Sequence, residues 1–126
     1  MGLIKFLLAD DSDAKIIMLE GMINKAQFPA EILIARTTEE AIRIINENPD
    51  IAFAFVDYEI PSELGPAIIS HLKEVNPNAH IALVSSGNSE RYQKDAEEAG
   101  AEKYICTSFE ADIVEKNLNE LLESWK

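Results

Sequence analysis

Three aspartates stand at the ends of two apolar runs in this chain. Asp10 and Asp11 directly follow the run Leu3–Ala9, and Asp57 directly follows the run Ile51–Val56. If these carboxylates meet, each like-charged pair at about 5 Å costs roughly 3 kcal/mol at an effective dielectric constant of about 20. Such a cluster holds a proton or a cation, and Mg²⁺ is a hard ion that takes oxygen ligands of this kind. We therefore expect a magnesium site built by these aspartates.

The elements that must position these residues alternate along the chain. Short apolar runs rich in Ile, Val, Leu and Phe are separated by longer amphipathic segments, and most runs lack polar alternation, which is typical of strands covered on both faces. The expected strands are Leu3–Ala9, Glu31–Ala35, Ile51–Val56, His80–Val84 and Lys103–Cys106. The expected helices are Asp13–Gln27, Thr38–Asn48, Leu64–Val75, Ser89–Ala99 and Phe109–Trp125, two of them opened by capping boxes that start at Thr37 and Thr107.

This alternation of strands and helices predicts the fold. Consecutive βα units favour an α/β architecture with one parallel sheet and helices on both faces, joined by right-handed crossovers. We expect a flavodoxin-like, three-layer (βα)5 fold with a five-stranded parallel sheet of order 2-1-3-4-5, in a single domain over residues 1–126. Open α/β sheets bind ligands beyond the carboxyl ends of their strands, here between the first and third strands. Asp10 and Asp11 follow the first of these strands, and Asp57 follows the third.

Simpler interpretations of the same residues stay open. Asp10, Asp11 and Ser12 could merely cap the following helix, and Asp57 taken alone could be an ordinary loop acid. Ser85 directly follows the run His80–Val84, where its hydroxyl could bond an anion held at Asp57, although serine is common at such junctions.

Charge and cysteine content restrict the partners and the compartment. The chain has 23 acidic and 11 basic residues, a formal net charge of −12. Such a surface repels nucleic-acid phosphates and anionic lipid headgroups, so we expect neither nucleic acid nor membrane as a direct partner. The single cysteine, Cys106, permits no intrachain disulfide. This favours a reducing, cytoplasmic location.

Several motifs together resemble a known family. The matching segments are Asp10-Asp11, Asp57-Tyr58-Glu59-Ile60-Pro61 with Gly65 beyond it, Val84-Ser85-Ser86, and Ala99-Gly100-Ala101 followed by Tyr104. In this order and spacing they resemble the receiver domain of bacterial two-component response regulators, including the single-domain regulators of chemotaxis. The strand order 2-1-3-4-5 is also the order of that family, so the two expectations are not independent.

The resemblance implies a role for each matching residue. Asp57 would accept a phosphoryl group from a sensor histidine kinase or a phosphotransfer protein. Mg²⁺ would be held by Asp11, Asp57 and the main-chain carbonyl of Glu59, with Asp10 acting through water.

Two further residues would transmit the signal. Ser85 would donate a hydrogen bond to a phosphoryl oxygen, and the switch residue Tyr104 would move inward behind it. The response would then reach a downstream protein target by direct contact.

One position departs from the family pattern. Thr107 stands where the family has a lysine that pairs with the acyl phosphate, and it brings no positive charge. Lys103 lies four residues earlier, about 13 Å back along an extended strand, and cannot substitute. Lys15 or Arg91, near the loops at the strand ends, could replace part of the charge.

These observations predict a phosphorelay receiver that is not an enzyme beyond Mg²⁺-dependent self-phosphorylation and autodephosphorylation. The alternative favoured by Thr107 is an atypical receiver that acts by protein binding without a productive phosphorylation switch. A Mg²⁺-dependent phosphohydrolase with Asp57 as nucleophile is disfavoured. Such enzymes typically have an aspartate two residues after the nucleophile, where this chain has Glu59.

Overall fold

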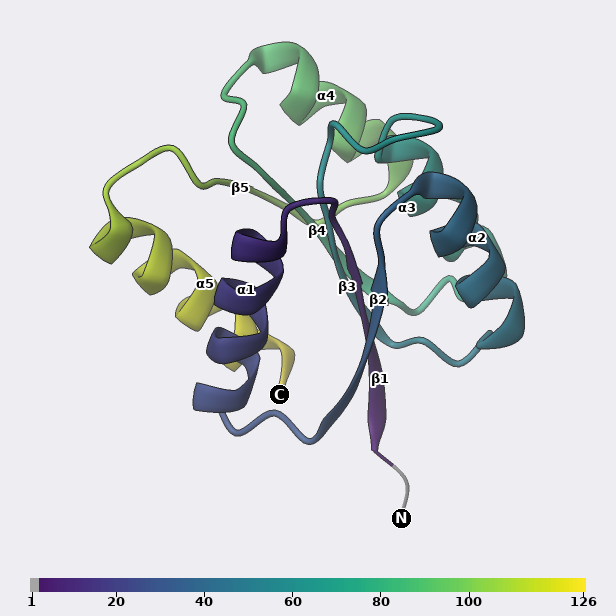
Figure 1. Ribbon diagram of the computed structural model, residues 1–126, viewed down its shortest axis with the longest axis horizontal. Helices are drawn as coiled ribbons and strands as arrows, with labels where there is room; N and C mark the ends of the chain where they lie inside the picture. The colour runs from purple at the N-terminus through teal and green to yellow at the C-terminus, as the bar shows by residue number, and fades with distance from the viewer. Residues whose placement is uncertain (1–2) are drawn as a thin grey trace.

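The five apolar runs form one parallel sheet in the computed structural model, which describes residues 3–126 (Figure 1). The strand order is β2-β1-β3-β4-β5, which confirms the expected fold. The domain expected over residues 1–126 includes Met1 and Gly2, which lie outside the described residues. The strands are β1 (Ile4–Ala9), β2 (Ala30–Ala35), β3 (Phe53–Val56), β4 (His80–Ser85) and β5 (Lys103–Cys106). The helices are α1 (Asp13–Lys25), α2 (Thr38–Glu47), α3 (Pro66–Val75), α4 (Glu90–Ala99) and α5 (Ala111–Trp125).

Helices cover both faces of the sheet, α1 and α5 on one side and α2, α3 and α4 on the other (Figure 1). Successive residues of β1 point to opposite faces, so Phe6 packs under α1 and α5 while Leu7 packs under α2 and α3. Trp125 is buried on the α1–α5 side, with its ring centroid 5.6 Å from that of Phe55. Its role is therefore packing of the core.

The register of the central strands places two of the aspartates side by side. Ala9 pairs with Val56 across β1 and β3, and the amide of Asp57 donates to the carbonyl of Ala9 at 2.9 Å. On the other side, the amide of Asp10 donates to the carbonyl of Ala35 at 2.9 Å. Both side chains therefore leave the sheet at its carboxyl edge from fixed backbone positions.

The start of α5 differs from the expectation. The capping box predicted at Thr107 is wrong, because α5 begins at Ala111 and its N-cap Glu110 makes no side-chain bond. The amide of Thr107 instead donates to the carbonyl of Ser85 at 2.8 Å, so Thr107 continues the pairing of β5 with β4. The chain then turns before α5. Among residues 3–126, no helix has both the length and the apolar character needed to cross a bilayer.

Candidate functional site

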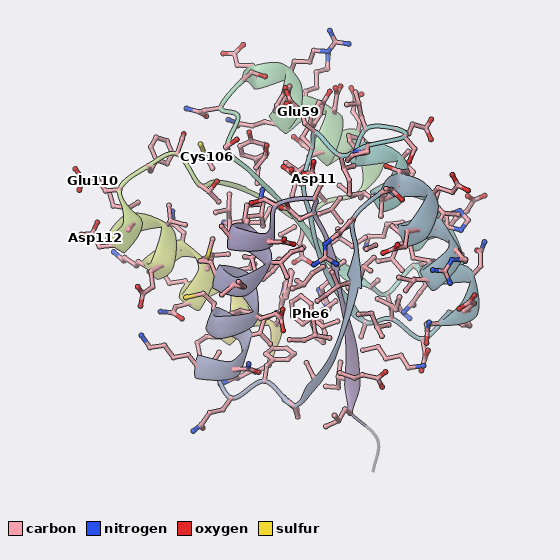
Figure 2. The ribbon with its side chains drawn as sticks, in the orientation of Figure 1. Phe6, Asp11, Glu59, Cys106, Glu110 and Asp112 are labelled. Carbon is pink, nitrogen blue, oxygen red and sulfur yellow. The ribbon has the colours of Figure 1, made fainter. Side chains whose placement is uncertain are left out.

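A cavity of about 670 Å³ lies at the carboxyl ends of β1, β3 and β4. Figure 2 shows Asp11 and Glu59 at this end of the sheet, while Phe6 lies further down in the interior. The polar residues of its wall include Asp10, Asp11, Lys15, Asp57, Glu59 and Ser85. The predicted metal ligands, the expected phosphoacceptor Asp57 and Ser85 therefore line the same cavity.

Three carboxylates meet in this cavity. One oxygen each from Asp10, Asp11 and Asp57 lies within 4.8 Å of the others, with Asp10 buried, Asp57 half-buried and Asp11 exposed. Within residues 3–126, the Asp11 carboxylate makes no hydrogen bond or ion pair. The spacing is that of an oxygen-ligand cluster for a hard divalent ion.

Asp10 is oriented by one of its two carboxylate oxygens. Its Oδ1 accepts a hydrogen bond from the amide of Ser12 at 2.9 Å, while Ser12 itself caps α1 by accepting from the amide of Lys15. The helix-capping interpretation therefore holds for Ser12. The Oδ2 atom of Asp10 is buried and receives no bond of hydrogen-bond geometry from any described residue. A buried carboxylate oxygen of this kind suits a cation.

The Asp57 carboxylate is influenced by burial, by a like charge and by an opposite charge. Its side chain is 12 % exposed, and its Oδ1 accepts a hydrogen bond from the amide of Tyr58 at 2.9 Å. Burial raises the pKa of Asp57, the charge of Asp10 raises it further, and the nearby Lys15 acts against both. The ionised carboxylate is thus held at a cost to the fold.

Lys15 is the cation that reaches this cluster. Its ammonium lies 2.8 Å from Asp10 Oδ2 and 3.1 Å from Asp57 Oδ1. Arg91, the other candidate from the sequence, is 83 % exposed on α4 and lies 3.7 Å from Asp95, outside the cavity wall. Of the two alternatives for the missing lysine, only Lys15 is close to Asp57.

Ser85 and Thr107 line different cavities. Ser85 is 2 % exposed at the end of β4, faces the acidic cavity, and accepts a bond from the amide of Gly87 at 3.2 Å. Thr107 instead lines a separate cavity of about 250 Å³ between α1 and α5, with Met18 and Phe109. The residue at the family's lysine position is therefore absent from the described wall of the acidic cavity.

Tyr104 is bound to the loop that follows β4. Its ring packs among the buried residues beside α4, and its hydroxyl donates to the carbonyl of Gly87. Burial raises the pKa of Tyr104, so the hydroxyl stays a donor at neutral pH. Tyr104, the expected switch residue, thus contacts the same loop whose amide bonds to Ser85.

A pair of stacked tyrosines joins the Asp57 loop to α4, and sequence reasoning missed it. The rings of Tyr58 and Tyr92 lie 3.6 Å apart with an interplanar angle of 10°. The Tyr58 hydroxyl donates to Asp95 at 2.6 Å, and the Tyr92 hydroxyl donates to the carboxylate of Glu59. That last bond raises the pKa of Tyr92 to about 12. The available signal was an aromatic residue directly after Asp57.

The fold and the cavity are those of a receiver domain, and the comparisons with known proteins agree. The model of the response regulator receiver domain matches residues 6–119, which shows that the chain belongs to this family. It is a receiver domain of two-component phosphorelay signalling. Receiver domains are phosphoacceptor signalling domains and not enzymes in the usual sense.

Individual relatives support the same conclusion. The chain is 30 % identical over 120 residues to the chemotaxis protein CheY of Halobacterium salinarum, covering 92 % of this chain and 94 % of that protein. Two solved structures share the fold. One is CheY of Borrelia burgdorferi in complex with CheX, BeF3 and Mg²⁺, with a TM-score of 0.79, 22 % identity and coverage of 98 % and 90 % of the two chains. The other is the phosphorylated cyanobacterial phytochrome response regulator RcpA, with a TM-score of 0.84, 16 % identity and coverage of 99 % and 94 %.

Proposed function

We propose that this chain works as one receiver domain that accepts a phosphoryl group on Asp57. The donor would be a phosphohistidine of a sensor histidine kinase or a phosphotransfer protein, and the output a contact with a downstream protein in the cytoplasm. The observation that carries the proposal is the meeting of Asp10, Asp11 and Asp57 in one cavity that Ser85 also lines. Family membership supports this function over that of a phosphohydrolase.

Asp57 would act as the nucleophile through its Oδ2 atom. The amide of Tyr58 and the ammonium of Lys15 both contact Oδ1, whereas Oδ2 makes no hydrogen bond or ion pair with the described residues. The carboxylate oxygen would form a bond to phosphorus while the bond from phosphorus to the histidine nitrogen breaks and the nitrogen keeps its electron pair. The phosphoryl group then carries a charge of about −1.5 to −2, which replaces the single negative charge of the carboxylate.

Ser85 and Tyr104 would carry the response to the surface. The Ser85 hydroxyl, buried in the cavity wall, could donate to a phosphoryl oxygen, but its Oγ also accepts from the amide of Gly87. Tyr104 bonds the carbonyl of the same Gly87. A shift of Ser85 would therefore reach Tyr104 through one residue, and with it the face made by α4, β5 and α5.

The residues of the cluster fit a magnesium ion. Asp10 Oδ2 is buried beside the Lys15 ammonium, 2.8 Å away, and the Asp11 carboxylate has no hydrogen bond or ion pair, both among residues 3–126. Asp11, Asp57 and the main-chain carbonyl of Glu59 would hold the ion, with Asp10 acting through water. When bound, the ion supplies positive charge to the crowded carboxylates and the transferring phosphoryl group.

Asp11→Asn is expected to weaken Mg²⁺ binding by about a hundredfold without changing the stability of the fold. Loss of partners in the outer shell alone costs about 10–100-fold, so loss of a ligand belongs at the upper end. Asp11 is exposed and holds nothing else in place, which spares the fold. Isothermal titration with MgCl2 measures the affinity. Asp13→Asn, an equal charge change on an exposed residue paired with Arg36, is the matched control; equal affinities in the two variants would contradict the site.

Incubation with acetyl phosphate and Mg²⁺ tests the proposed function. Intact-mass spectrometry should show one added phosphoryl group, and chelation of the metal with EDTA should prevent it. No added mass with acetyl phosphate or with phosphorylated histidine donors would contradict the phosphoacceptor role.

The position of Thr107 favours one second candidate, the atypical receiver. Thr107 occupies the position of the family's lysine, but it has no charge and lines a different cavity. The chain therefore lacks the positive charge that pairs with the acyl phosphate in the family. The atypical function predicts that beryllofluoride and Mg²⁺ bind at Asp57 while the NMR signals of Tyr104 and α4 stay unchanged. The phosphorylation switch predicts that those signals shift.

A further inference from the structure

Lys15 is the only basic residue among the described residues that line the acidic cavity. Its side chain is 12 % exposed, and its ammonium lies within 3.1 Å of two carboxylates that follow different strands, β1 and β3. A lysine on a helix surface would ordinarily extend into water. The Lys15 side chain instead lines the acidic cavity.

Lys15 lies at a position in α1 where a positive charge is unfavourable. Ser12 caps the helix, so Lys15 is the third helical residue and lies in the first turn. The positive end of the helix dipole disfavours a cation there. The attraction of Asp10 and Asp57 must therefore offset both that repulsion and the loss of water around the ammonium.

We propose that Lys15 supplies the positive charge that the lysine missing at Thr107 would have given. In this assignment the ammonium offsets part of the negative charge of Asp10 and Asp57 before phosphorylation. After transfer it pairs with an oxygen of the phosphoryl group on Asp57. The second half of this assignment rests on the proposed phosphoacceptor function.

The assignment makes Lys15 a competitor of the metal as well as a partner of the phosphoryl group. The ammonium contacts Asp57 Oδ1 and Asp10 Oδ2, and carboxylates of the same two residues belong to the cluster that suits a divalent ion. A magnesium ion would compete with the ammonium for the negative charge of these carboxylates. The long flexible stem of lysine lets the displaced charge stay at the cavity.

Lys15→Met is therefore expected to change two measurements in opposite directions. Isothermal titration should show Mg²⁺ binding about tenfold tighter than in the wild type, because a competing positive charge has gone. At saturating Mg²⁺, phosphorylation by acetyl phosphate should be about tenfold slower, because a charge on the phosphoryl group has gone. A side chain with a purely structural role would not tighten metal binding when removed.

Two further variants serve as controls for the loss of charge in Lys15→Met. Lys116→Met removes the same charge from an exposed site on α5 and should leave both measurements unchanged. Lys15→Arg keeps the charge and should recover part of the phosphorylation rate while leaving Mg²⁺ binding as weak as in the wild type. Circular dichroism melts verify that each variant is folded, and Lys15→Gln, which also removes the charge but keeps a polar side chain, carries the test if Lys15→Met does not fold.

The result separates this inference from the proposed function. If the wild type accepts a phosphoryl group but Lys15→Met matches it in rate at saturating Mg²⁺, the inference is overturned and the function stands. Unchanged Mg²⁺ affinity in Lys15→Met also overturns it. If the wild type accepts no phosphoryl group, beryllofluoride binding replaces the rate, and a weaker complex in Lys15→Met supports Lys15 as the partner of the anion, whereas an equal one overturns it.

Discussion

Replacing Gly65 by alanine is expected to destabilise the protein by about 3 kcal/mol, the upper range for forcing atoms into a packed site. A Cβ at this position would overlap the main-chain carbonyl of Asp57 and press on the side chain of Val56. Both neighbours belong to the strand end that carries the proposed phosphoacceptor, and a main-chain carbonyl cannot rotate away as a flexible side chain can. Relief therefore requires that the loop after β3 move.

The loop has little freedom to move. The amide of Gly65 donates to the carbonyl of Tyr58 at 2.8 Å, and the carbonyl of Gly65 accepts from Ile68 in the first turn of α3. Gly65 has a φ of −51°, which any residue adopts, so the requirement for glycine is one of space. Alanine must break one of these bonds or displace Asp57.

Urea unfolding and the acetyl phosphate reaction together check the prediction. Gly21→Ala, in the middle of α1 where a Cβ meets nothing within 4 Å, is the matched control. It should stabilise the protein by about 0.5–1 kcal/mol, because alanine is the better helix former. A loss below about 1 kcal/mol in Gly65→Ala, with an unchanged phosphorylation rate, would show that the loop tolerates the added carbon.

The strands and helices were predictable because most of their determinants are local in the sequence, whereas the strand order was also that of the family that the motifs resemble. Buried strands read as continuous apolar runs, and breakers such as Gly100 mark where helices end. The start of α5 was not predictable in this way. Thr107 satisfies a capping pattern, yet its amide is taken by Ser85 of a distant strand, and a tertiary bond of that kind leaves no trace near Thr107.

The acidic cluster was predictable for a related reason. A residue that directly follows a buried parallel strand must emerge at the carboxyl edge, so Asp10, Asp11 and Asp57 could be placed without coordinates. The direction of a long side chain cannot be predicted in the same way. Lys15 could have extended into water, and its turn inward depends on the electrostatic field of the assembled carboxylates. The stacking of Tyr58 on Tyr92 likewise depends on where α4 packs.

Asp57→Asn is expected to abolish the phosphoryl adduct while making the fold more stable at neutral pH. The adduct is lost because an amide is not a nucleophile of the required kind. The stability gain, about 1 kcal/mol, is typical of a functional site relieved of strain. It follows here because the ionised carboxylate is buried beside Asp10, which raises the pKa of Asp57 in the folded state.

The pH dependence of this gain has a defined sign. An unfolded chain ionises Asp57 near its ordinary pKa of 3.8, whereas the folded chain holds the proton to a higher pH. The wild type therefore loses stability as pH rises from 3.8 through the folded pKa, and it stays at the lower value above that pKa. The stability advantage of Asp57→Asn over the wild type should therefore be full at pH 7 and shrink as pH falls toward 3.8.

An exposed aspartate gives the control with the opposite sign. The hydrogen bond from Lys5 lowers the pKa of Asp50, so its ionised form contributes to stability and Asp50→Asn should lose stability at neutral pH. Asp50→Asn should also keep the phosphoryl adduct. Thermal melts of the three proteins in EDTA, from pH 4 to about 8, measure both trends. An Asp57→Asn variant that is less stable than the wild type at pH 7 would mean that Lys15 more than offsets the burial of Asp57, and that the site is not held at a cost.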